Sequence, residues 1–145
     1  MDSFKLEIFN SKHPGQKFEF ISLNMTDTNW VISAVLDKVN LIISNKLSEP
    51  FFKQLLQTLD NIIPLINESI PQTLKEYFHE HSVSPDSLVF IIWDIDQNAD
   101  LLTSKGIISH WDDIWYGPSD EAMVIFIPSI SKILLLADYG LIKSN

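Results

Sequence analysis

The chain has 145 residues, of which 46% are hydrophobic and 20% are charged, and its formal net charge at pH 7 is −9. This composition is typical of a globular protein, and the length suits one domain with a core of its own, so we expect a single domain over residues 1–145. There is no cysteine, which excludes disulfides, cysteine-ligated metals and thiol nucleophiles. All ten basic residues are lysines, and an acidic chain without arginine is poorly suited to nucleic acid.

The longest apolar run, 133–137, is far shorter than a membrane span requires. Residues 1–5 lack the basic and apolar regions that begin a signal peptide. We therefore expect a cytoplasmic protein that does not bind membranes.

The first half of the chain predicts a hairpin followed by helices. Apolar and polar residues alternate over 4–9 and again over 17–23, which predicts two strands joined by a loop that contains a Pro-Gly turn. Apolar residues then recur at helical spacing in three segments, each with a capping residue or proline at its start. These segments are 28–43, 51–63 and 70–78.

The second half changes to short, continuous apolar runs, which predict strands at 88–93, 122–127 and 132–137. The last two are separated by only four residues and are expected to form an antiparallel hairpin, with a short terminal strand at 141–142. Strands, then helices, then strands indicate an α+β fold. The simplest arrangement is one mostly antiparallel sheet with about three helices packed on one face.

Acidic and aromatic residues gather between residues 86 and 121. This window has eight acids against one base, Lys105, and it contains three of the four tryptophans. Charge of one sign beside tryptophan and tyrosine is typical of a surface that meets a basic partner.

Trp111 and Trp115 have two interpretations. Together with Ile114 they stand at the i, i+3 and i+4 positions of a helical turn, which would suit ordinary core residues. That interpretation leaves the adjacent acids, Asp112 and Asp113, unexplained. We favour a partner-facing surface in which the aromatic residues are anchors and the acids supply charge.

Alternative kinds of site are less well supported. Residues 94–105 resemble a calcium loop, but Ala99 replaces the required glycine and Lys105 replaces the final acid. His79, His81 and His110 do not have a recognised metal-ligand spacing, and no phosphate-binding loop or activated serine is present. We therefore expect no metal, no cofactor and no enzymatic activity. A metal-dependent hydrolase that uses Asp94, Asp96 or Asp112 remains an alternative.

Three segments near the C-terminal end carry a family resemblance: Trp111–Tyr116, Pro118–Phe126 and Leu134–Gly140. This part of the chain resembles small bacterial immunity proteins, the antidotes encoded beside polymorphic or contact-dependent growth-inhibition toxins. The resemblance covers about the last 35 residues. It implies that the protein binds and blocks a toxin domain, often a nuclease, in the cytoplasm of the producing cell.

We therefore predict a toxin-neutralising protein that binds a basic toxin domain through an acidic, aromatic surface. The predicted anchors and acids of this surface are Trp111, Asp112, Asp113, Trp115, Tyr116, Asp120 and Glu121. An outer ring of acids is predicted at Asp94, Asp96 and Asp100. A monomer is expected, although a regulatory or structural module, for example a homodimer, is an alternative that measurement of size in solution would separate.

Overall fold

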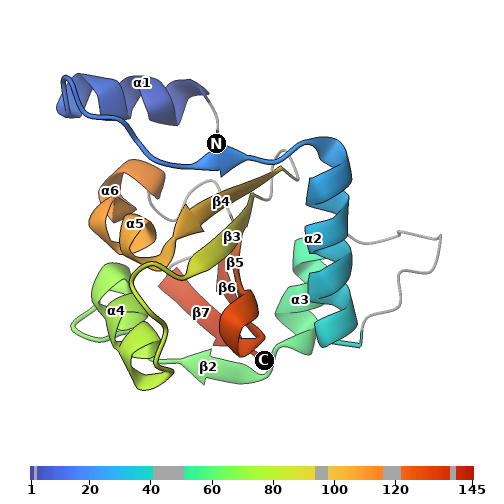
Figure 1. The fold of residues 1–145 in the computed structure, drawn as a ribbon. Coiled ribbons are helices and arrows are strands. Elements are labelled where there is room, and N and C mark those ends of the chain that lie inside the picture. Colours follow the sequence, from blue (N-terminus) through green and yellow to red (C-terminus); the bar gives the residue numbers. More distant parts are fainter. Residues whose placement is uncertain (2, 41–50, 94–97, 116–121, 138–139) are drawn as a thin grey trace.

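A computed structural model describes residues 1, 3–40, 51–93, 98–115, 122–137 and 140–145. The protein has the predicted α+β architecture, built on one seven-stranded antiparallel sheet (Figure 1). The strand order is β1-β4-β3-β5-β6-β7-β2. The strands are β1 (Ile21–Ser22), β2 (Asn61–Ile63), β3 (Leu88–Trp93), β4 (Ala99–Thr103), β5 (Met123–Ile127), β6 (Lys132–Ala137) and β7 (Leu141–Ser144).

The centre of the sheet follows the predicted strands closely. In β3, Ile91 pairs with Ile125 of β5, and Ile125 pairs in turn with Leu134 of β6. The predicted link between β5 and β6 is a short 3-10 turn, η1 (Pro128–Ile130), and Ser131 after it has a φ of 54°. The antiparallel hairpin and the terminal strand β7 are thus confirmed.

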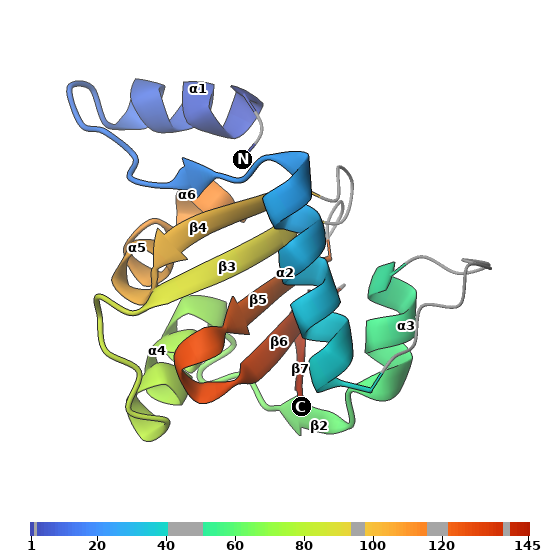
Figure 2. The same cartoon turned by 45° about the vertical axis from the view of Figure 1, so that its right-hand side comes forward.

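Helices cover both faces of the sheet, which corrects the expectation of about three helices on one face. They are α1 (Ser3–Lys12), α2 (Met25–Lys38), α3 (Phe51–Thr58), α4 (Ile70–Glu80), α5 (Ser104–Ser109) and α6 (Trp111–Ile114). The core residues of α2 and α3 pack on one face, and those of α1, α4, α5 and α6 pack on the other (Figure 2).

The continuous apolar runs explain why both faces are covered. All five residues of β5 are buried. Met123, Ile125 and Ile127 belong to the core under α1, α4, α5 and α6. The intervening Val124 and Phe126 belong to the core under α2 and α3. Because neighbouring residues of a strand point to opposite faces, a strand without polar alternation needs a cover on each side.

The predicted N-terminal hairpin is wrong. Residues 3–12 form α1, and only β1 from the second predicted strand joins the sheet, where it pairs with β4. The reason is burial: Lys5 and Phe9 are the buried residues of α1, and they are four positions apart, on one side of a helix. A segment of this length does not establish its period by itself, and packing against the rest of the chain selects the helix.

The three predicted helices differ in how well they match the helices of the structure. The start of α4 is confirmed, because Ser69 caps it and accepts a hydrogen bond from the Gln72 amide. The α2 helix is confirmed up to Lys38, and the rest of its predicted range beyond residue 40 lies outside the described residues. The helix predicted over 51–63 ends at Thr58, because residues 61–63 form β2 and pair with β7.

Strand β4 and helix α5 have no counterpart among the predicted elements. Thr103 ends β4 and caps α5, its hydroxyl accepting a hydrogen bond from the Gly106 amide at 3.0 Å. Among the described residues, no helix has the length and apolar character needed to cross a membrane.

Candidate functional site

Trp111 and Trp115 belong to the core. Helix α6 is a single turn that buries Trp111, Ile114 and Trp115, and the two indole rings stack with their centroids 5.8 Å apart. The core interpretation of this spacing is therefore confirmed, and the favoured interpretation of these tryptophans as exposed anchors is wrong. Their burial orients the turn so that Asp113 lies beside the end of α1.

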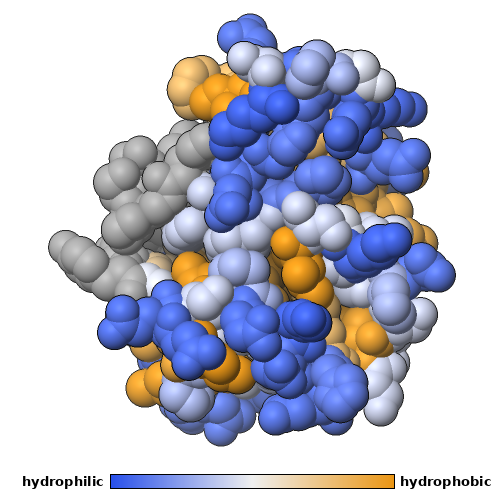
Figure 3. Space-filling model, turned by 90° about the vertical axis from the view of Figure 1, so that its left-hand side faces the viewer, coloured by the Kyte–Doolittle hydropathy of each residue, from blue (hydrophilic) through white to orange (hydrophobic). Residues whose placement is uncertain are grey.

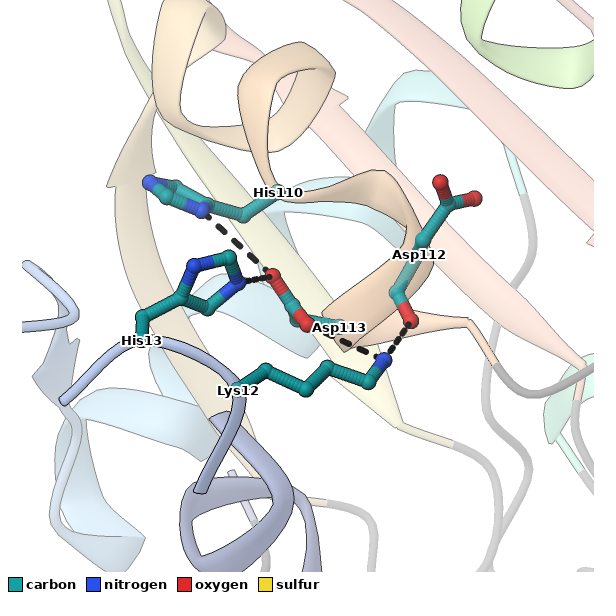
Figure 4. A network of polar contacts seen from close by, with 5 residues as sticks. All are labelled: Lys12, His13, His110, Asp112 and Asp113. Carbon is teal, nitrogen blue, oxygen red and sulfur yellow. Dashed lines mark hydrogen bonds and ion pairs between the residues drawn. The ribbon is translucent and has the colours of Figure 1, made fainter. Parts of the chain in front are cut away.

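The two acids of α6 have opposite environments. Asp112 is exposed, whereas Asp113 is only 6% exposed. Figure 4 shows the Asp112 carboxylate pointing away from the cluster that surrounds Asp113. The pair therefore does not form two carboxylates that face one reaction site. Burial of Asp113 also corrects its prediction as a surface acid.

Asp113 is the centre of a polar cluster formed by Lys12, His13, His110 and Asp113 (Figure 4). Lys12 Nζ lies 3.3 Å from Asp113 Oδ1. His13 Nε2 lies 3.0 Å from the other carboxylate oxygen, Oδ2, and His110 Nδ1 lies 3.5 Å from the same oxygen. Lys12 also donates to the backbone oxygen of Asp112 at 3.4 Å. A buried carboxylate thus has three positive or potentially positive partners.

Local structure explains how these residues meet across the chain. Lys12 is the last residue of α1, and Gly15, with a φ of 81°, turns the chain just after His13. The His110 ring packs edge-on against Phe9 and Phe18, with centroids 5.2 and 5.1 Å away. The aromatic contacts place the end of α1 beside the short segment that joins α5 and α6.

Histidine nitrogens and a carboxylate oxygen are typical ligands of transition metals. One ligand atom from each of His13, His110 and Asp113 lies within 4.8 Å of the others. From the sequence no metal site is expected, and His110 is a candidate ligand only together with His79 and His81. The structure instead joins His110 to His13, which lies almost a hundred residues away. No local pattern identifies His13, so sequence spacing could not have revealed this group.

Asp100, predicted in the outer acidic ring, is completely buried. It accepts hydrogen bonds from the Trp93 indole at 2.7 Å, from the Ser22 hydroxyl and from the Met1 amine. The ammonium of Lys5 lies over the Trp93 ring, 3.9 Å from its centroid. Asp100 is therefore a structural residue that connects β1, β3 and β4, and its prediction as a surface acid is wrong.

The remaining predicted positions divide into two groups. Asp112 is the one predicted acid that is exposed among the described residues. The others lie outside the described residues: Asp94, Asp96, Tyr116, Asp120 and Glu121.

An exposed tryptophan that the sequence analysis did not select lies on α2. Trp30 is 65% exposed, and Ile21 and Met25, 61% and 81% exposed, precede it in the chain. Asp27 and Asp37, also exposed, stand three and seven positions from Trp30 and so lie near it along the helix. The available signal was that Trp30 falls outside the apolar stripe that begins at Val31.

A pocket of about 400 Å³ lies between α4 and α5. Its lining includes the apolar side chains of Phe78, Val83 and Ile108 and the basic residues Lys75 and Lys105. Figure 3 views the molecule from this side and shows apolar side chains among hydrophilic ones. Its residues do not include the Asp113 cluster.

Comparisons with protein-family models, with curated proteins and with solved structures find no match for this chain.

Proposed function

We propose that the protein binds a basic protein domain and neutralises it, as an immunity protein does for a toxin. The observation that carries this proposal is Trp30, a tryptophan that is 65% exposed on α2, a helix that carries Asp27 and Asp37 against one base, Lys38. Of the large hydrophobic residues that are exposed in the described chain, three lie within residues 21–30. Tryptophan is one of the residue types enriched at the energetic centre of protein interfaces.

Charge supports a basic partner. The net charge of −9 attracts a positive domain over distances longer than a contact, and it speeds the encounter more than it tightens the complex. Asp27 and Asp37 provide negative charge on the same helix as Trp30. We name Asp27, Trp30 and Asp37 the α2 surface. In this proposal it takes the role predicted from the sequence for the Trp111 region.

A growth assay tests the function itself. The C-terminal domain encoded by the reading frame immediately upstream is expressed in a bacterial host, with and without this protein. We expect the domain alone to stop growth and co-expression to restore it. A neighbouring domain that is harmless, or one that stops growth equally in both cultures, would contradict the proposed function.

A binding assay with the same domain tests the α2 surface. We expect Trp30→Ala to weaken binding by about 30-fold or more, which is the usual effect of truncating a central anchor. We expect Asp27→Lys with Asp37→Lys to slow association and to reduce its dependence on salt.

The matched control makes the same change of charge elsewhere. Glu80→Lys with Asp86→Lys reverses two exposed acids at and beyond the end of α4, on the opposite side of the sheet. If this control slows association as much as the α2 variant does, net charge alone accounts for the effect. If Trp30→Ala also binds as tightly as the wild type, the α2 surface is the wrong site, even where growth rescue succeeds.

A further inference from the structure

We propose that His13, His110 and Asp113 form a binding site for a divalent transition-metal ion of the zinc type. The three residues come from the end of α1, the segment between α5 and α6, and α6 itself. The proposal goes beyond the interaction with a partner protein and does not depend on it.

The positions of the ligand atoms carry the proposal. His13 Nε2 and His110 Nδ1 lie 3.0 and 3.5 Å from the same oxygen, Asp113 Oδ2. In a tetrahedral zinc site with bonds of about 2.0–2.1 Å, neighbouring ligand atoms stand about 3.3 Å apart. The two observed separations bracket that value. The ligand atoms of all three residues lie within 4.8 Å of one another, so we expect side-chain movements to be enough for them to share one ion.

Burial and solvent access also suit a metal. The Asp113 side chain is only 8% exposed, whereas those of His13 and His110 are 32% and 28% exposed. The carboxylate is therefore held inside the protein while water can reach the imidazole side. Three protein ligands with a solvent molecule in the fourth position are a common zinc coordination.

The ligand set favours zinc over magnesium and calcium. Imidazole nitrogen binds zinc, cobalt, nickel and copper well, whereas magnesium and calcium take oxygen ligands. Lys12 lies on the other side of the carboxylate, 3.3 Å from Oδ1, and leaves Oδ2 to face the histidines. The arrangement therefore favours binding of the metal through one carboxylate oxygen.

The test uses the full chain after treatment with a chelator and dialysis. Thermal unfolding is measured with zinc chloride and with magnesium chloride. At a zinc concentration about 100 times the Kd, we expect the Tm to rise by about 5–10 °C. Magnesium should leave the Tm unchanged. Cobalt should give the visible absorption of a tetrahedral site, which reports ligation independently of stability.

Variants assign the site. His13→Gln removes one ligand on the exposed turn after α1 and should abolish both the zinc-dependent rise in Tm and the cobalt spectrum. His79→Gln, at an exposed histidine of α4 outside the cluster, is the matched control and should retain both. The proposal is overturned if zinc and cobalt have no effect on the wild-type protein. It is also overturned if His13→Gln binds as the wild type does, or if His79→Gln loses binding.

Discussion

Asp100 and Asp113 are buried acids, and each is surrounded by donors. The burial of a charged group costs free energy unless hydrogen bonds and opposite charge offset it. Asp100 accepts hydrogen bonds from the Trp93 indole and the Ser22 hydroxyl. Asp113 is in contact with one lysine, Lys12, and with two histidines, His13 and His110. These two acids hold together parts of the chain that are distant in sequence.

The adjacent acids of α6 provide a matched pair for a stability measurement. We expect Asp113→Ala to lower the free energy of unfolding by about 1–2 kcal/mol, because its hydrogen bonds are lost while its partly exposed partners regain water. Asp112→Ala should change it by less than about 0.5 kcal/mol, since that side chain is exposed. Urea denaturation of both variants, after removal of metal, measures the difference. Equal effects would show that the Asp113 cluster does not stabilise the fold.

Tyr77 gives a prediction for alkaline pH. Burial raises the pKa of its hydroxyl above the ordinary value of 10.0, and a contact with Ser144 lowers it in part. That contact is weak, because the hydroxyl has no partner in hydrogen-bond geometry among the described residues. A raised pKa means that the folded state keeps its proton longer than the unfolded state. The stability associated with Tyr77 is therefore complete below pH 10 and is lost as the pH rises toward and through the folded-state pKa.

We expect Tyr77→Phe to remove this loss of stability at alkaline pH. At pH 7 the variant should be as stable as the wild type or more stable by up to about 1 kcal/mol, because a buried hydroxyl without a strong partner is replaced by hydrogen. Urea denaturation at pH 7 and at pH 10.5 compares the two proteins. If the variant loses more stability than the wild type between pH 7 and pH 10.5, the prediction is wrong.

At the scale of elements, α1 shows how packing selects between the two-residue period of a strand and the 3.6-residue period of a helix. A strand over 4–9 would place Phe9 on the side opposite Phe4, Leu6 and Ile8. In α1, Phe9 is 2% exposed, and the centroid of its ring lies 5.0 Å from that of the Phe18 ring. Phe4 is 62% exposed. The helix therefore depends on Phe9 as its main contact with the core.

We expect Phe9→Ala to lower the free energy of unfolding by about 3–5 kcal/mol, the usual cost of emptying an aromatic site in a core. Phe4→Ala, a change of the same size in the same helix, should cost less than about 1 kcal/mol because the side chain is mostly exposed. Urea denaturation provides both values. A larger effect at Phe4 than at Phe9 would argue against α1 as described.

The elements that the sequence could predict are those with a strong local pattern. The runs at 88–93, 123–127 and 133–137 are apolar throughout, and Ser69 followed by Ile70 and Pro71 marks a helix start. By contrast, β1 and β2 have two and three residues and exist because distant strands pair with them. Segments this short have too few residues to establish a period.

At the scale of the whole molecule, the candidate site could not be read from local pattern. The spacing of Trp111, Ile114 and Trp115 correctly indicated core residues as one of two interpretations. The acids beside them suggested a surface, because charged residues are rarely buried without partners. The partners of Asp113 include Lys12 and His13, about a hundred residues earlier, and only the folded chain brings them together.

The two short strands β1 and β2 stand at the two ends of the strand order. An open sheet edge offers free amide and carbonyl groups that can pair with another chain, and very short edge strands limit such pairing. Here an incoming strand would find only two residues of β1 or three of β2. In the described part of the chain, the architecture therefore limits growth of the seven-stranded sheet by strand addition, and the proposed α2 surface relies on side chains rather than on strand pairing.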